Sequence, residues 1–127
     1  MLISDDDWTS TSSNGTCNCS IDFNNGSFIN FRDAGGAALP YGPNEYEVIT
    51  LCPDSTGSKM VLAILNDPAN GYVLNIHPTD TLYVYDGTSI NAPLLAAIND
   101  STYPNGVNIP ASWSNTSGCL TFKFVSD

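Results

Sequence analysis

A strand that runs into a turn, at residues 79–88 (TDTLYVYDGT), constrains the fold of this chain more than any other segment. Side chains alternate along a β-strand, so Leu82 and Val84 are expected on one face and the two tyrosines of the segment on the other. The Asp86-Gly87 pair that follows can adopt the positive φ angles of a tight hairpin. The segment therefore predicts a half-buried strand that ends in a turn.

A second segment of the same kind lies at residues 118–127 (GCLTFKFVSD). Each of the two strands adjoins a carboxylate, because Asp80 precedes the first and Asp127 follows the second. Carboxylates at strand ends, where a sheet meets its loops, are well placed to be ion ligands. The two segments together predict a β-sheet with acidic residues at its margin.

The rest of the chain also favours strands over helices. It is rich in Gly, Pro, Asn, Ser and Thr and poor in the long charged residues that cover helix surfaces. Residues 59–65 are almost wholly apolar, which suits a central strand, although a short helix has the same pattern. The predicted strands are 27–31, 46–52, 59–65, 72–76, 81–85, 94–98, 106–109 and 119–125.

Charge excludes two classes of partner. The chain has 3 Lys and Arg against 13 Asp and Glu, a formal net charge of -10. Nucleic acids and anionic membranes need a cationic face, so neither is expected as a partner. No apolar run approaches the roughly 20 residues of a membrane-spanning helix, so no membrane insertion is expected. The balance suits a surface protein, a cation binder, or both.

Three further short motifs come before the two strand segments in the chain. They are FRDAGG at residues 31–36, YGPNE at 41–45 and VITLCPD at 48–54. With those segments, the chain resembles the CUB domain, in the form found in secreted and surface proteins of Bacteroidota. The resemblance implies an antiparallel β-sandwich, a CUB-like jelly roll, over residues 17–127, behind an extended N-terminal lead at residues 1–16.

The resemblance also implies one more strand after the position that matches Asp127. The sandwich is therefore expected to lack its last strand, which a longer protein or another chain would supply. In the resembled group, such proteins are often exported by the type IX secretion route. We expect a secreted or cell-surface location.

Calcium is the cofactor that the resemblance implies. In calcium-binding CUB domains, the positions that match Asp80 and Asp127 help to coordinate one ion, and Asp33 and Glu45 from the opening loops are further candidates. Calcium takes 6–8 oxygen ligands. The family's glutamate a few residues before the first aspartate is missing here, and Asp67 and Asn75 are poorer substitutes. The alternative is that Asp80 caps a turn and Asp127 is solvated.

Four cysteines in a short chain suggest an oxidising compartment. Cys17 and Cys19 are too close in sequence for an easy bond to each other, so different partners are favoured. Our first prediction is a Cys52–Cys119 bridge across the sandwich. The second ties Cys17 or Cys19 to Cys52, and buried free thiols are the third reading.

Exposed aromatic residues are the candidate binding surface. Trp113 lies in a predicted loop and Tyr41 in an opening loop, and aromatic faces stack on sugars and dominate protein interfaces. The alternative for Trp113 is that it caps the core. Tyr83 and Tyr85 are better explained as covering one face of the sandwich.

An enzyme is not expected. His77 is the only histidine and has no partner in a recognisable catalytic motif, so it is read as a surface residue. Most carboxylates sit in turns, where aspartate serves the backbone. The Asp-Ser-Thr segments that contain Ser55 and Ser101 resemble the O-glycosylation pattern of Bacteroidota proteins, so both serines are candidate glycosylation sites. Asn115 is a third candidate, because it begins an Asn-X-Ser sequon.

The sequence thus predicts a non-catalytic extracellular interaction or adhesion module of a larger protein that binds a protein or glycan through loops at one end, with calcium as the stabilising ion that the resemblance implies. A carbohydrate-binding module of a secreted hydrolase is the first alternative. A structural subunit that assembles into filaments by strand donation is the second.

Overall fold

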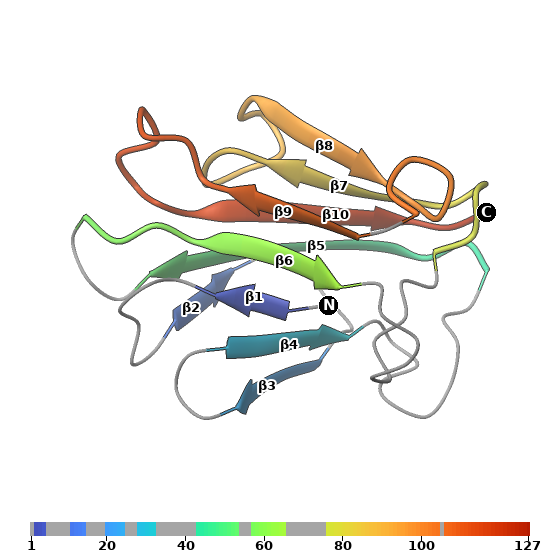
Figure 1. Cartoon of the computed structure of the whole chain (residues 1–127), viewed down its shortest axis with the longest axis horizontal. Coiled ribbons are helices and arrows are strands. Elements are labelled where there is room, and N and C mark those ends of the chain that lie inside the picture. The colour runs from blue at the N-terminus through green and yellow to red at the C-terminus, as the bar shows by residue number, and fades with distance from the viewer. Residues whose placement is uncertain are drawn as a thin grey trace.

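The structure, a computed structural model, describes residues 43–53, 57–62, 76–104 and 106–127 with their side chains. It also describes the backbone strands at 2–4, 11–14, 20–24, 28–32 and 63–65. These residues form two five-stranded antiparallel sheets, which confirms the predicted β-sandwich (Figure 1). The described residues include no helix that could cross a membrane.

The first sheet brings the N-terminus into its centre. Within the segment predicted as an extended lead, β1 pairs with strands on both of its sides. The strands of this sheet are, in spatial order, β3 (Ser20–Asn24), β4 (Phe28–Arg32), β1 (Leu2–Ser4), β6 (Val61–Leu65) and β9 (Gly106–Pro110).

The second sheet holds the segments that carry the candidate sites. Its strands are, in spatial order, β2 (Thr11–Asn14), β5 (Tyr46–Pro53), β10 (Leu120–Val125), β7 (Thr81–Tyr85) and β8 (Leu94–Ile98). The strand β2 also comes from the predicted lead and pairs with β5. The strands β7 and β10, which lie in the two segments 79–88 and 118–127, are neighbours in this sheet.

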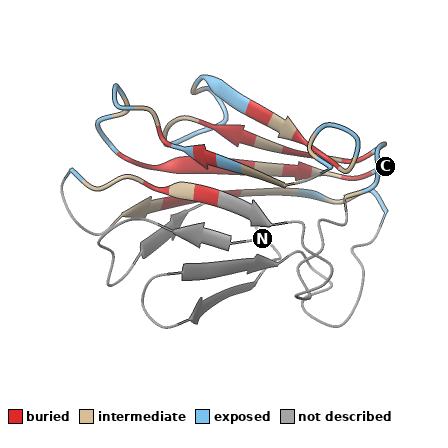
Figure 2. Ribbon diagram, viewed as in Figure 1, coloured by how far each residue is buried: buried red, intermediate tan, exposed pale blue. Residues whose placement is uncertain are grey.

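The core lies between the sheets, as the alternation predicts. Phe122 on β10 stands opposite Ile49 on β5 and Val84 on β7, and all three side chains are buried. Buried positions follow one another along β7 and β10 (Figure 2). Leu62 on β6 and Ile109 on β9 join the same cluster. Burial of one such side chain stabilises the fold by about 1.5–3 kcal/mol, so this cluster fixes which face of each strand points inward.

Most predicted strands are confirmed. The segments at 27–31, 46–52, 59–65, 81–85, 94–98, 106–109 and 119–125 correspond to β4 to β10. The helical alternative for 59–65 is wrong, because β6 pairs with β1 and β9. Of the predicted strand 72–76, only Ile76 is among the described residues, and it is not in a strand. The short strands β1 and β2 were not predicted, because neither segment has an alternating apolar pattern.

The prediction of a tight hairpin at Asp86-Gly87 is wrong. A longer loop, residues 86–93, joins β7 to β8, and Gly87 is not among the described residues with positive φ. The backbone N–H of Asp86 donates to the carbonyl of Pro93 at 2.8 Å, which closes the loop at its base. Gly87 is needed for another reason: a Cβ there would lie 2.7 Å from the Cβ of Ala92.

The Cys52–Cys119 disulfide is confirmed, but its predicted position across the sandwich is wrong. The bridge joins neighbouring strands of one sheet, because Leu51 on β5 stands opposite Leu120 on β10 and the two cysteines are the next pair. Their Cα atoms are 4.2 Å apart. Facing residues of an antiparallel pair come this close, so the sheet itself presents the two thiols to each other.

Candidate functional site

The strand β7 has a carboxylate at each end. Asp80 directly precedes it and Asp86 directly follows it, so their Cα atoms are about 20 Å apart at 3.3 Å per residue. Because β10 is antiparallel to β7, its end brings Asp127 to Asp80 and its start brings the preceding loop to Asp86 (Figure 1). The candidate residues therefore fall into two opposite groups, named here the acidic end (Glu45, Asp80 and Asp127) and the tryptophan loop (residues 111–119).

At the acidic end, side chains hold the backbone together. Asp80 is buried, and its Oδ1 accepts the backbone N–H of Asp127 at 3.0 Å. The Ser126 hydroxyl accepts the N–H of Glu45 at 2.8 Å, and the N–H of Ser126 donates to the Glu45 carbonyl at 3.0 Å. The amide of Asn99 donates to the Asp80 carbonyl at 3.3 Å. The start of β5 and the residues around β7 and β10 are thus fastened to one another.

The acidic end contains the oxygen donors that calcium prefers. The Asp80 side chain and the Oε2 atom of Glu45 are buried, whereas Asp127 is exposed. Across the part of the chain that the structure describes, however, no three carboxylate, histidine or cysteine side chains are arranged to hold a metal ion. Asp33 lies outside the described residues, and calcium binding stays a prediction.

Trp113 lies at the opposite end and points into solvent. Its side chain is 90% exposed, against 58% for Tyr46, the next most exposed large apolar residue among those described. The reading that Trp113 caps the core is therefore wrong. The distance between the two ends also means that an ion bound between Asp80 and Asp127 would not touch this loop.

Asp86 holds the tryptophan loop from the neighbouring loop. Its Oδ1 accepts the backbone N–H of Ser112 at 3.0 Å and the side-chain amide of Asn115 at 2.8 Å. Its Oδ2 accepts the Ser112 hydroxyl at 2.5 Å. One carboxylate thus fixes the residues on both sides of Trp113, and hydrogen bonds to a charged group are stronger than neutral ones.

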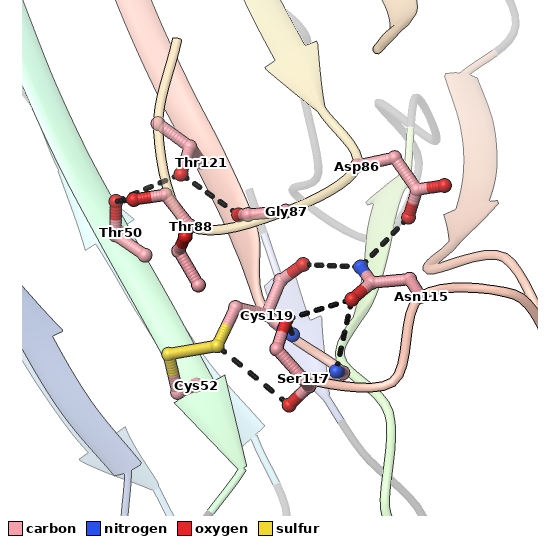
Figure 3. Close-up of a disulfide and its surroundings, with 10 residues drawn as sticks. Thr50, Cys52, Asp86, Gly87, Thr88, Asn115, Ser117, Cys119 and Thr121 are labelled. Carbon is pink, nitrogen blue, oxygen red and sulfur yellow. Dashed lines mark hydrogen bonds between the residues drawn. A yellow bond between two sulfur atoms is a disulfide. The ribbon is translucent and has the colours of Figure 1, made fainter. Parts of the chain in front are cut away.

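The side chain of Asn115 holds the tryptophan loop together through hydrogen bonds to other residues of the loop (Figure 3). Its Nδ2 also donates to the carbonyl of Cys119 at 2.8 Å, and its Oδ1 accepts the Ser117 hydroxyl at 2.7 Å and the Gly118 N–H at 3.1 Å. The Lys59 ammonium donates to the Asn115 carbonyl. Both hydrogens of the amide are used, so Asn115 acts as a structural residue of the loop.

The electrostatics of Asp86 follow from these contacts. Partial burial raises the pKa of Asp86, but the hydrogen bonds from Ser112 and Asn115 and the charge of Lys59 outweigh it, and the pKa lies below the usual 3.8. The carboxylate is therefore ionised at neutral pH and acts only as an acceptor.

The base of the loop is equally constrained. Gly118 has a φ of 70°, and a Cβ there would lie 2.1 Å from the carbonyl oxygen of Ser58. Only glycine fits both the conformation and the space. Directly after it, Cys119 is tied to β5 by the disulfide. Trp113 is thus presented by a loop that is fixed at its root and along its length.

A second contact joins the loop at residues 86–93 to the outer face of the second sheet. The Thr121 hydroxyl donates to the Gly87 carbonyl at 2.9 Å, and the hydroxyls of Thr50 and Thr121 are 2.8 Å apart (Figure 3). Both threonines are buried although they face away from the core. The loop that carries Asp86 is therefore itself anchored on β5 and β10.

Tyr83 and Tyr85 cover the outer face of the second sheet, as predicted. The ammonium of Lys123 lies 4.5 Å from the centre of the Tyr83 ring and 5.7 Å from that of Tyr85. A hydrogen bond with Tyr85 raises the pKa of Lys123, against the effect of burial. His77 is exposed, as expected of a surface residue, and its Nδ1 lies 2.9 Å from the Thr79 hydroxyl.

The remaining predicted residues differ in their placement. Tyr41 and Ser55 lie outside the described residues, as do Cys17 and Cys19. Ser101 is exposed on a turn, and its glycosylation stays a prediction. A glycan on Asn115 would replace one of the two amide hydrogens that the loop uses, so the folded chain disfavours modification there.

Sequence reasoning missed the residues that hold Trp113 in place. Asp86 was assigned to a turn, and Ser112 and Lys59 gave no signal. The Asn-X-Ser segment carried the one available signal, because an asparagine side chain in a loop often accepts a hydrogen bond from the backbone that follows it, as Asn115 does from Gly118. Contacts between loops 29 residues apart, as between Asp86 and Asn115, leave no local pattern.

In comparisons with known proteins, no family model, curated protein or solved structure matches this chain.

Proposed function

We propose that this chain is a non-catalytic recognition module of a secreted or cell-surface protein, and that it binds its partner through the tryptophan loop. The observation that carries the proposal is Trp113, which is 90% exposed on a loop fixed by Asp86, Asn115 and a disulfide. A tryptophan typically buries 150–250 Å² in a fold or an interface. Here that surface is offered to a partner.

The rigidity of the loop supports recognition. A contact residue on a mobile loop loses conformational freedom on binding, which costs about 0.5–1.5 kcal/mol per ordered side chain. The hydrogen bonds of Ser112 and Asn115 order the backbone beside Trp113 before any partner arrives. The loop is thus preorganised for contact.

The disulfide supports the proposed location, and the contacts of Asp80 and Asp86 support a non-catalytic role. Cys52–Cys119 fits an oxidising compartment, where such bonds persist. The carboxylates of Asp80 and Asp86 accept hydrogen bonds from backbone and loop groups and do not face one another. Their role is to position chain segments.

The test is binding of the fluorescently labelled chain to intact cells of the source organism. Trp113→Ala should weaken surface binding by about 30-fold, the effect of a hot-spot residue worth 2 kcal/mol. Tyr46→Ala, the matched control, removes an exposed aromatic side chain at the acidic end and should leave binding unchanged. Equal binding by Trp113→Ala and the unchanged chain would overturn the proposal.

A further inference from the structure

The exposed residues that share the tryptophan loop with Trp113 are polar. The exposed residues that follow it in the tryptophan loop are Ser114, Thr116 and Ser117, and none is apolar. Protein interfaces usually surround an aromatic hot spot with further apolar side chains in a packed core. A flat aromatic face beside serine hydroxyl groups instead matches a ligand that has apolar C–H faces and polar edges, as a sugar ring does.

The hydroxyl groups beside Trp113 have a fixed direction of donation. Ser112 gives its one hydroxyl hydrogen to the Asp86 carboxylate at 2.5 Å, because the carboxylate only accepts. Ser112 Oγ and Ser114 Oγ are 3.0 Å apart, so Ser114 must donate to Ser112. The hydrogen of Ser114 is therefore committed inward, and its exposed oxygen is left to accept from a ligand.

The hydroxyl hydrogen of Ser117, further along the loop, is also donated within the loop. The Ser117 hydroxyl donates to Asn115 Oδ1 at 2.7 Å and accepts the Cys119 N–H at 3.2 Å. The tryptophan loop thus uses the hydrogens of its serine hydroxyls internally. Its complement is a ligand rich in hydroxyl donors.

Charge is balanced in the two described loops of this end, although the whole chain is strongly acidic. Asp86 is the only acidic residue in the segments 86–93 and 106–119. The charge of Lys59, which donates to Asn115, acts on Asp86. No surplus charge selects an anionic or a cationic ligand here, while the net charge of -10 repels polyanions.

From these contacts we infer that the tryptophan loop binds a neutral, hydroxyl-rich polysaccharide, with one sugar ring stacked on Trp113 and one of its hydroxyl groups donating to Ser114. This inference rests on the proposed function and names its ligand class.

The test is native affinity electrophoresis of the full chain through gels that contain one soluble polysaccharide each. The neutral probes are barley β-glucan, xyloglucan, galactomannan and dextran, and the charged probes are polygalacturonate and poly-L-lysine. We expect at least one neutral gel to retard the chain. Trp113→Ala should abolish the retardation, with affinity reduced about 30-fold or more, and Ser114→Ala should weaken it about three- to tenfold.

Matched controls separate this contact from a general effect. Thr116→Ala removes another exposed hydroxyl of the loop, and Tyr46→Ala removes the exposed aromatic residue at the far end. Both should be retarded like the unchanged chain. Because Trp113 and Ser114 are exposed, their variants should keep the melting temperature, which excludes misfolding as a cause.

Each other outcome overturns the inference. These outcomes are no retardation in any neutral gel, equal retardation of Trp113→Ala, or retardation only by a charged polymer. If Trp113-dependent binding to cells persists while every neutral gel is inert, the proposed function stands and a protein partner replaces the polysaccharide. If both assays are negative, the proposed function fails as well.

Discussion

Asp86 and Asn115 lie on different loops and are joined by a hydrogen bond of 2.8 Å between Oδ1 and Nδ2. Through this bond, the loop that follows β7 fixes the loop that precedes β10. Trp113 owes its fixed position to the pair, since Ser112 bonds to the same carboxylate. Presentation of the tryptophan therefore depends on residues that need not touch a ligand.

Replacement of Asp86 by Asn should loosen the loop. The asparagine has the same shape but places an amide donor against the donors of Ser112 or Asn115, and loss of a charge-assisted hydrogen bond costs about 1.5–3 kcal/mol. We expect a lower free energy of unfolding in urea and a lower fluorescence anisotropy of Trp113, measured in a Trp8→Phe background. Thr116→Ala is the control for the anisotropy. Unchanged anisotropy in Asp86→Asn would show that the carboxylate does not order the loop.

Acid should release the loop through the same group. The pKa of Asp86 is depressed in the folded chain, so the unfolded chain binds its proton first as the pH falls. The contribution of Asp86 to stability is therefore full above the unfolded pKa, near 3.8, and is lost as the pH falls through the lower folded pKa. Trp113 anisotropy should be flat from about pH 8 to 5 and should fall only as the pH drops below 3.8, through the lower folded pKa. Asp86→Asn should lack this step, and a step retained in that variant would assign it to another group.

Gly118→Ala should destabilise the fold. The new Cβ would lie 2.1 Å from the Ser58 carbonyl oxygen and the residue would keep a φ of 70°. Strain of this kind costs about 1–3 kcal/mol. Gly57→Ala is a matched control, because its φ is 88° but its Cβ would meet nothing within 4 Å. Urea unfolding should rank Gly118→Ala below Gly57→Ala, and the reverse order would mean that the space at Gly118 does not decide its identity.

Removal of the Cys52–Cys119 bridge should lower stability. The bond closes a sequence separation of 67 residues, and disulfides of this kind contribute about 2–4 kcal/mol. The double variant Cys52→Ala/Cys119→Ala should unfold at a lower urea concentration and should bind ligand more weakly, since Cys119 roots the tryptophan loop. Peptide mapping of the unreduced chain should recover the two cysteines in one linked pair. A different pairing in that map would contradict the register of β5 and β10.

Calcium binding at the acidic end is tested by thermal melting. If the ion binds there, about 1 mM calcium should raise the melting temperature, in the affinity range of extracellular calcium modules. EDTA should reverse the rise and Asp80→Asn should remove it. Ligand binding at Trp113 should not change, because the two sites are about 20 Å or more apart along β7. The same melting temperature with calcium and with EDTA would contradict the prediction.

The sequence alone determined the class of fold and the positions of most strands. Alternation in segments such as Thr81–Tyr85 is a local property that depends only on which side chains prefer burial, so it is legible without a structure. The sequence also placed Trp113 in a loop, but it left open whether the side chain faces solvent or caps the core, which only the structure decided. The Cys52–Cys119 pair was found because each cysteine lies at the end of a predicted strand.

The tertiary structure decided how those elements meet. The order of strands placed Asp80 beside Asp127 and put Trp113 at the opposite end, and it set Cys52 and Cys119 in one sheet. Asp86 was read as a turn residue, since a hydrogen bond between distant loops has no periodicity. The contacts that fix Trp113 are long-range and few, and only the packed chain brings their partners within 3 Å.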